Sequence, residues 1–290
     1  MRDEFPTDAE LMLPAPAKLN LFLHIVGRRA DGYHNLQTIF QFLEYADNLF
    51  FNTRHDGEIK LHTPFINVPH HDNLIIRAAN LLKARTKTSL GADIWIDKKL
   101  PMGGGIGGGS SNAATTLLAL NLLWRTHYNL SQLATLGLQL GADVPVFVHG
   151  KAAFAEGVGE KLTFIEPHEH WYLVAMPEIN VHTASVFKEP SLTRNTPPIT
   201  PQQALLIDGR NDCQAVVLNK YPTIEHAFTL MNQLSPTKLT GTGACLFSPF
   251  STQEKALEAQ IKLSSQLNSF VARSTNHSLL HTALHKYSTH

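Results

Sequence analysis

A run of glycines is the part of this sequence whose chemistry is easiest to state. Residues 101–113 read Pro-Met-Gly-Gly-Gly-Ile-Gly-Gly-Gly-Ser-Ser-Asn-Ala, and six of the seven residues from Gly103 to Gly109 are glycine. Glycine tolerates positive φ and has no Cβ, so a ligand can approach its backbone closely. Successive N–H groups of such a loop converge on an anion, and a following helix adds unpaired N-terminal donors. The run therefore predicts a phosphate-binding loop.

Other interpretations of the glycine run fit less well. Gly103, Gly105 and Gly108 satisfy the dinucleotide pattern G-x-G-x-x-G. However, residues 98–101 separate the predicted strand from the loop, and no acidic residue ends a strand about 20 residues later. The P-loop spacing is present, but Gly109 stands where that motif requires lysine. A flexible linker is disfavoured because the run lies between a strand and an apolar helix.

Two charged residues could take part in a reaction. Asp143 lies between Gly141-Ala142 and the apolar run 144–148, which is an unusual place for a carboxylate unless it is paired or used. A helix-terminal or turn aspartate is the alternative. Lys18 begins a largely apolar strand, where a lysine is usually solvated. Asn20, two residues later, projects to the same face of that strand as Lys18.

The residues around the glycine run leave alternatives open. Ser110 and Ser111 could cap the following helix, reach phosphate or Mg²⁺, or do both. Lys98 could reach a phosphate or remain solvated. The glycine turn at 240–244 precedes an apolar strand and is by itself only a turn.

Motifs spread along the chain resemble those of the GHMP kinases, the superfamily of galactokinase, homoserine kinase and mevalonate kinase. The glycine run is similar to the second motif of these enzymes. The other similar segments, in chain order, are 16–21 (Pro-Ala-Lys-Leu-Asn-Leu), 31–34 (Asp-Gly-Tyr-His), 140–147 (Leu-Gly-Ala-Asp-Val-Pro-Val-Phe) and 239–245 (Leu-Thr-Gly-Thr-Gly-Ala-Cys). The similarity is greatest to the branch that phosphorylates the 2-hydroxyl of a cytidine-diphosphate-linked methylerythritol in isoprenoid precursor biosynthesis. Another GHMP kinase, of homoserine or mevalonate type, is the nearest alternative.

The resemblance implies an α+β fold of two domains. Residues 1–165 would form an ATP-binding domain like ribosomal protein S5, and residues 166–290 a ferredoxin-like domain on the substrate side. It also implies ATP with Mg²⁺, and a small-molecule cytidine-diphosphate substrate. A nucleotide-binding protein without catalysis, and more distantly a dinucleotide-dependent oxidoreductase, remain as alternatives from other classes.

The resemblance assigns roles residue by residue. Lys18 and Asp143 would be catalytic, with the lysine keeping the carboxylate ionised so that it can accept the substrate's hydroxyl proton. No metal ligand is assigned, apart from Ser110 through Mg²⁺. Phe187 could equally be an ordinary core or loop aromatic. The implied ATP contacts are Lys98, Pro101, Met102, Gly103, Gly104, Gly105, Ile106, Gly107, Gly108, Gly109, Ser110 and Ser111. The implied substrate contacts are Asn20, Tyr33, His34, Phe187, Thr240, Gly241, Thr242 and Gly243.

Composition excludes several other classes. The 290 residues carry 24 basic and 24 acidic side chains, so no global charge recruits nucleic acid or an anionic membrane. The acidic, prolyl start of the chain is unlike a signal peptide, and we expect a cytoplasmic monomer or homodimer. Cys213 and Cys245 are expected to be reduced and buried. Among 16 histidines, His277, His281 and His285 share a helical face, and a solvated helix is favoured over a metal site.

The sequence pattern also predicts the elements that position these residues. Predicted strands lie at 18–25, 36–43, 48–52, 92–97 and 171–176. Predicted helices lie at 73–84, 112–124 and 131–140, the last with Ser131 as N-cap, and at 202–206, 215–218, 223–234 and 252–266. A proline-rich loop is expected at 191–201.

Overall fold

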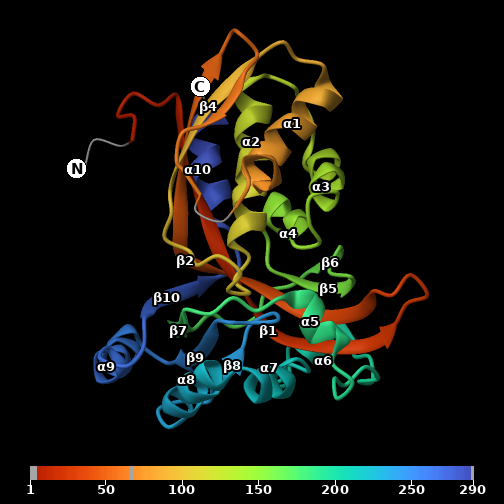
Figure 1. Cartoon of the computed structure of the whole chain (residues 1–290), viewed down its shortest axis with the longest axis vertical. Helices are drawn as coiled ribbons and strands as arrows, with labels where there is room; N and C mark the ends of the chain where they lie inside the picture. The colour runs from red at the N-terminus through yellow and green to blue at the C-terminus, as the bar shows by residue number, and fades with distance from the viewer. Residues whose placement is uncertain (1–4, 66–67, 289–290) are drawn as a thin grey trace.

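The computed structural model describes residues 5–65 and 68–288 (Figure 1). Its longest feature is an antiparallel pair, β1 (Leu11–Arg28) and β2 (His34–Arg54), which runs through both halves of the molecule. The other edge of β2 pairs in turn with β5 (Ala153–Gly157), β10 (Ser269–Thr275) and β4 (Gly91–Asp97). One strand therefore holds the whole sheet together.

Two of the predicted strands, 36–43 and 48–52, are one strand in the structure. The polar segment between them suggested a break, and that prediction was wrong. Tyr45 stacks on Phe270 with ring centroids 3.8 Å apart, and Asp47 is fully buried with hydrogen-bond partners. Buried polar residues that have hydrogen-bond partners do not interrupt a strand, so the polar residues between 43 and 48 were no reason to divide it.

Helices pack on the upper part of the sheet in Figure 1. They are α1 (Leu74–Thr86), α2 (Gly108–Leu123), α3 (Leu130–Leu138), α4 (Val144–His149) and α10 (Leu279–Ser288). Side chains from the first four helices and Leu280 of α10 join strand residues in one apolar core. The apolar helix expected at 112–124 is confirmed. The N-cap of α3 is Asn129, in a capping box with Gln132, so the prediction of Ser131 was wrong by two residues.

The lower part is a second antiparallel unit, in the order β10-β7-β9-β8. Its other strands are β7 (Trp171–Ala175), β8 (Lys238–Leu239) and β9 (Leu246–Phe250). Its helices are α5 (Thr183–Lys188), α6 (Pro201–Ala204), α7 (Gln214–Lys220), α8 (Pro222–Asn232) and α9 (Gln253–Leu263). The remaining short elements, η1 (His70–Asp72), β3 (Ile59–Leu61) and β6 (Lys161–Phe164), belong to the upper part.

The chain crosses between the two parts more than once. β10 pairs with β2 above and with β7 below, and α10 then returns to pack against β1. A single boundary at residue 165 stays a prediction, and the last helix lies with the first part.

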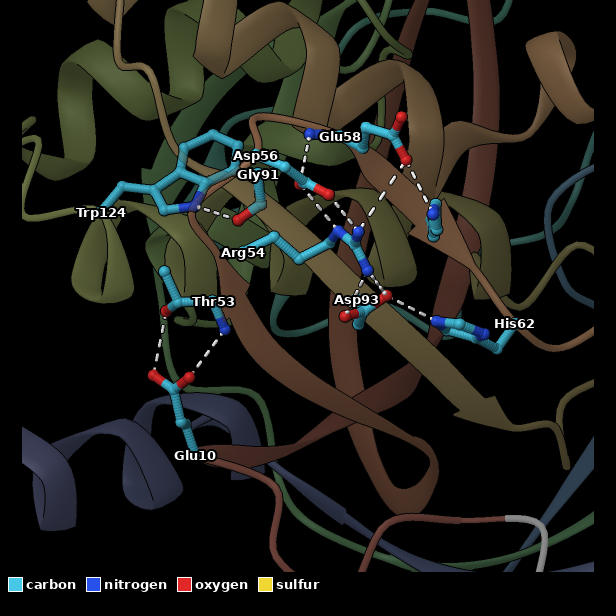
Figure 2. Close-up of polar contacts among 10 residues, drawn as sticks. Glu10, Thr53, Arg54, Asp56, Glu58, His62, Gly91, Asp93 and Trp124 are labelled. Atoms are coloured by element: carbon cyan, nitrogen blue, oxygen red, sulfur yellow. Dashed lines mark hydrogen bonds and ion pairs between the residues drawn. The ribbon is translucent and has the colours of Figure 1, made fainter.

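A polar network ties β2 to β4 at their outer ends (Figure 2). Arg54 makes two 3.0 Å bonds to the carboxylate of Asp93, and His62 approaches that carboxylate to 2.6 Å. Asp56 also pairs with Arg54, which holds the pKa of the Asp56 carboxyl down at about 2. These bonds join neighbouring strands, so the network fixes the register of the sheet edge.

Both cysteines, Cys213 and Cys245, are free and buried in the part of the chain that the structure describes, as expected. No helix among these residues is long and apolar enough to span a bilayer.

Candidate active site

A cleft of about 1040 Å³ lies where the two parts meet, against the β1–β2 pair. Most of the residues that the sequence predicted for the site line it. They are Lys18, Asn20, Tyr33, His34, Pro101, Gly103, Gly104, Gly105, Gly107, Gly108, Gly109, Ser110, Asp143, Phe187, Gly241, Thr242 and Gly243. The fold therefore brings together motifs that are separated by more than 200 residues in the chain.

Lys18 lies in the floor of this cleft with its side chain almost completely buried. Its ammonium donates to Asn20 Oδ1 at 2.5 Å and to the Gly105 carbonyl at 3.0 Å, and lies 3.3 Å from Asp143 Oδ2. Asn20 is held from behind, because its backbone N–H donates to the Thr240 hydroxyl at 3.0 Å. Alternation along β1 thus places lysine and asparagine on one face, as predicted.

Asp143 occupies the N-cap position of α4, where its side chain makes no bond to that helix among the described residues. Its carboxylate is paired with Lys18 instead, and the Asp143 side chain is 33% exposed to the cleft. The arrangement provides a carboxylate acceptor that a bound hydroxyl group could reach.

The glycine loop packs against the 240–244 turn. Cys245 N–H donates to the Gly104 carbonyl at 2.9 Å, and Lys18 N–H donates to the Ile106 carbonyl at 3.0 Å. Gly105 has a φ of +76°, and a Cβ there would lie 2.3 Å from the Thr240 carbonyl oxygen. Only glycine fits this position, because both the backbone conformation and the contact exclude a side chain.

Helix α2 begins directly from this loop, with Gly107 as its N-cap. Gly108, Gly109 and Ser110 form its first turn and line the cleft. The N–H groups of a first helical turn have no intrahelical acceptors, and the helix dipole makes that end positive. The positive end of α2 therefore lies at the cleft, and the binding of an anion there stays a prediction.

The serines do not cap α2, which corrects the default interpretation. The helix begins two residues before Ser110, so both serines lie within its first turns. Ser110 lines the cleft. Ser111 is fully buried, and its hydroxyl has no hydrogen-bond partner within residues 5–65 and 68–288.

Lys98 lies outside the lining of the cleft. Its ammonium pairs with Asp47 Oδ2 at 2.8 Å and also donates to the Leu100 carbonyl. Burial lowers the pKa of Lys98, while the charge of Asp47 opposes that shift. Asp47 in turn accepts from the backbone N–H groups of Lys99 and Leu100. Lys98 thus anchors the segment that leads into the glycine loop, and its contact with phosphate stays a prediction.

Three further predicted residues also lie outside the lining. Ile106 and Thr240 are fully buried, and the Thr240 hydroxyl accepts a hydrogen bond from the Asn20 backbone, so both residues pack under the cleft without lining it. Met102 is half exposed, at a turn of the loop.

His34 and Phe187 also line the cleft, and they form a stacked pair with ring centroids 5.0 Å apart. Tyr33 beside them is 66% exposed. Burial lowers the pKa of His34, and the cations Arg194 and Arg28 lower it further. His34 is buried and Phe187 is partly exposed, and flat aromatic surfaces of this kind suit a planar base.

Three cations that line the cleft, Arg28, Lys188 and Arg194, were not predicted from the sequence. Arg28 lies shortly before the 31–34 segment and Lys188 lies next to Phe187, and this closeness in the sequence was the available signal. Arg194 lies in the proline-rich loop at 191–201, where no pattern marked it.

The predicted helical face of three histidines is wrong at two of them. His277 lies before α10, where it forms a β-bridge with Lys151. His281 Nε2 donates to the Val148 carbonyl at 2.9 Å, and burial lowers the pKa of this ring. The expectation failed at His281 because α10 packs against the end of α4. No group of three potential metal ligands occurs among the described residues.

Comparison with known proteins agrees with this geometry. The sequence profile described as "GHMP kinases N terminal domain" matches residues 73–151, which include the glycine loop and Asp143. The chain belongs to the GHMP kinases.

Close relatives narrow the assignment. The 4-diphosphocytidyl-2-C-methyl-D-erythritol kinase of Ectopseudomonas mendocina (strain ymp) is 59% identical over 279 residues, covering 96% of each chain. The kinase of the same name from Pseudomonas fluorescens (strain Pf0-1) is 57% identical, covering 96% of this chain and 98% of its own. A crystal structure of 4-(cytidine 5'-diphospho)-2C-methyl-D-erythritol kinase superposes with a TM-score of 0.80 at 29% identity, over 91% of this chain and 99% of that one. Within the GHMP kinases, the chain belongs to the family of 4-diphosphocytidyl-2-C-methyl-D-erythritol kinases.

Proposed function

We propose that this chain transfers the γ-phosphoryl group of ATP to the 2-hydroxyl of 4-diphosphocytidyl-2-C-methyl-D-erythritol, giving the 2-phosphate and ADP. The observation that carries the proposal is the Lys18–Asp143 pair, which lies beside the glycine loop in the floor of one cleft. The glycine loop, the first turn of α2 and the His34–Phe187 pair line the same cleft. A nucleoside triphosphate and a cytidine-linked alcohol would therefore meet at Asp143.

The residues divide the work of phosphoryl transfer. Asp143 accepts the proton of the attacking hydroxyl, and Lys18, whose ammonium lies 3.3 Å from that carboxylate, holds it in place and orients the hydroxyl. Asn20 fixes the Lys18 ammonium through the 2.5 Å bond between them. Because this reaction depends mainly on positioning and electrostatics, no phosphoenzyme is needed, and the transfer is a single in-line step.

The triphosphate would be held by the loop and by the first turn of α2. The N–H groups of Gly107 to Ser110 lie at the cleft, at the positive end of the helix. Ser110 is the residue in this turn that fits Mg²⁺, since its hydroxyl is an oxygen donor beside the phosphate site. When bound, Mg²⁺ would neutralise part of the negative charge of the phosphates.

The cytidine group would occupy the end of the cleft at Tyr33, His34 and Phe187. The aromatic rings offer stacking surfaces, and the imidazole offers a hydrogen bond to the edge of the base. Arg28 and Lys188, which also line the cleft, provide positive charge for the diphosphate of the substrate.

The test is an ADP-release assay with Mg-ATP and three alcohols: the cytidine substrate, mevalonate and homoserine. We expect release that is stimulated by the cytidine substrate alone. Stimulation by another alcohol would keep the kinase and overturn the roles of Tyr33, His34 and Phe187. Folded protein that binds ATP and releases no ADP with any alcohol would favour a non-catalytic nucleotide-binding protein.

A further inference from the structure

Arg194 directs most of its hydrogen bonds into its own loop. Its Nη2 donates to the carbonyls of Phe187 at 2.9 Å and Glu189 at 2.7 Å, and its Nη1 donates to Leu192 at 3.0 Å. A guanidinium presents donors in a fixed plane, so it can hold several carbonyls of one loop at once. The backbone carbonyls of Phe187, Glu189 and Leu192 therefore all accept hydrogen bonds from the one guanidinium of Arg194.

The remaining donor of Arg194 faces the imidazole of His34. Arg194 Nε lies 3.3 Å from His34 Nε2. Arginine cannot accept a hydrogen bond and does not lose its proton, so Nε2 must be the acceptor. A neutral histidine carries one ring proton, and that proton must then be on Nδ1. The same cation opposes protonation of the ring.

His34 and Phe187 come from different parts of the chain, β2 and α5, and their rings stack with centroids 5.0 Å apart. Arg194 is bonded to both residues, to the ring of one and the backbone of the other. Its guanidinium therefore links the two sides of the aromatic end of the cleft.

We propose that Arg194 is a positioning residue, which holds His34 and Phe187 as one unit and fixes His34 as the neutral Nδ1–H tautomer. The proposal rests on the proposed function only in naming the ligand, a pyrimidine nucleotide. A ring with one defined donor can distinguish the edge of one base from another, whereas a ring that exchanges tautomers cannot. Arg194 thus sets substrate selectivity without touching the reacting atoms.

The first test is kinetic. Arg194→Gln removes the donors at Nη1 and Nη2, and we expect the KM for the cytidine substrate to rise at least about tenfold, which is the loss of about 1.4 kcal/mol of binding. The KM for ATP is expected to stay within about twofold, since ATP lies at the other end of the cleft. Arg194→Lys keeps one donor and should recover part of the loss, and it serves if the glutamine variant does not fold.

Lys220→Gln is the matched control. Lys220 is an exposed cation that contacts the same loop through the Glu189 carboxylate, at 2.5 Å. Its removal should leave both KM values unchanged, because it holds no carbonyl and does not reach His34. Equal increases in both KM values for the arginine variants would show a merely structural role and overturn the proposal.

The second test reads the tautomer directly, without substrate or turnover. Nitrogen-15 NMR of the His34 ring, assigned by its loss in His34→Gln, should show protonated Nδ1 and acceptor Nε2 near pH 8. The cations facing the ring are Arg194 and Arg28, and both favour the neutral form. Arg194→Met, which leaves no donor facing His34 Nε2, should shift the ring toward Nε2–H. An unchanged tautomer would overturn the proposal, whereas failure of the ADP-release assay alone would count against the function and leave this result standing.

Discussion

Two lysine–aspartate pairs flank the glycine loop, and their surroundings differ. In Lys98–Asp47 the carboxylate is completely buried and accepts two backbone N–H groups as well as the ammonium. In Lys18–Asp143 the lysine is the buried partner, and the carboxylate is 33% exposed to the cleft. The same two residue types therefore form a buried anchor in one place and a pair with an accessible carboxylate in the other.

The two pairs differ in whether the carboxylate oxygens are already used by the protein. Asp47 is committed to the chain segment before the loop, so it fixes backbone geometry and has no access to a ligand. Asp143 has lone pairs that face the cleft, and Lys18 is steadied by Asn20 and Gly105 rather than by Asp143 alone. Chemistry at a charged pair requires an exposed atom, whereas structural stability requires a satisfied one.

Lys18→Met should have the largest effect on the reactive pair. It removes the cation that pairs with Asp143 and that, in the proposed function, orients the hydroxyl, so we expect kcat to fall by roughly 10³-fold. Steady-state kinetics on protein with unchanged circular dichroism measures this. Activity within tenfold of wild type would mean that the Lys18–Asp143 contact is only structural.

Asp47→Asn should affect the other pair in the opposite way. It leaves the Lys98 ammonium without its counter-ion, and we expect the free energy of unfolding to fall by about 3 kcal/mol, measured by urea titration. Adding Lys98→Met should restore part of the loss, because the isolated charge is then gone. No loss in the single variant would contradict the assignment of this pair as an anchor.

Gly105→Ala tests whether the loop between the pairs depends on its contact with the 240–244 turn. Positive φ and the 2.3 Å approach to the Thr240 carbonyl predict strain of about 1–3 kcal/mol. Weaker ATP binding should accompany it, as measured by calorimetry. Gly109→Ala is the control, since a Cβ there meets only the flexible Leu74 side chain at 3.2 Å, and it should be much milder.

His281 should give the smallest effect, which is seen only as a pH dependence. Burial lowers its pKa in the folded state, so its contribution to stability is present above the unfolded pKa of 6.5 and is lost as the pH falls through the folded pKa. His281→Gln should make the loss of stability below pH 6.5 shallower in urea titrations. His71→Gln, at a side chain that is 82% exposed, should leave the slope unchanged.

The sequence predicted the parts of the site that motifs encode. The glycine run predicted its own loop, whereas the pairing of Lys18 with Asp143 was implied by resemblance, since no spacing rule brings residue 18 to residue 143. Asn20 followed from strand alternation. Local pattern also predicted the apolar body of α2, because hydrophobic runs report burial directly.

The rest depended on contacts that the sequence does not display. The continuity of β2 depends on partners for Tyr45 and Asp47 that lie far along the chain. The burial of His281 depends on α10 meeting the end of α4. Arg194 binds carbonyl groups, which every residue has, so its role leaves no signature in residue types.

The most direct test of the account is the turnover number of Asp143→Asn, measured at saturating ATP and cytidine substrate. The account predicts a fall of about 10²–10⁴-fold in kcat, with ATP affinity and the free energy of unfolding close to wild type. This substitution keeps the shape of the side chain and removes the base. A variant that turns over at the wild-type rate would contradict the central claim that Asp143 accepts the proton of the attacking hydroxyl.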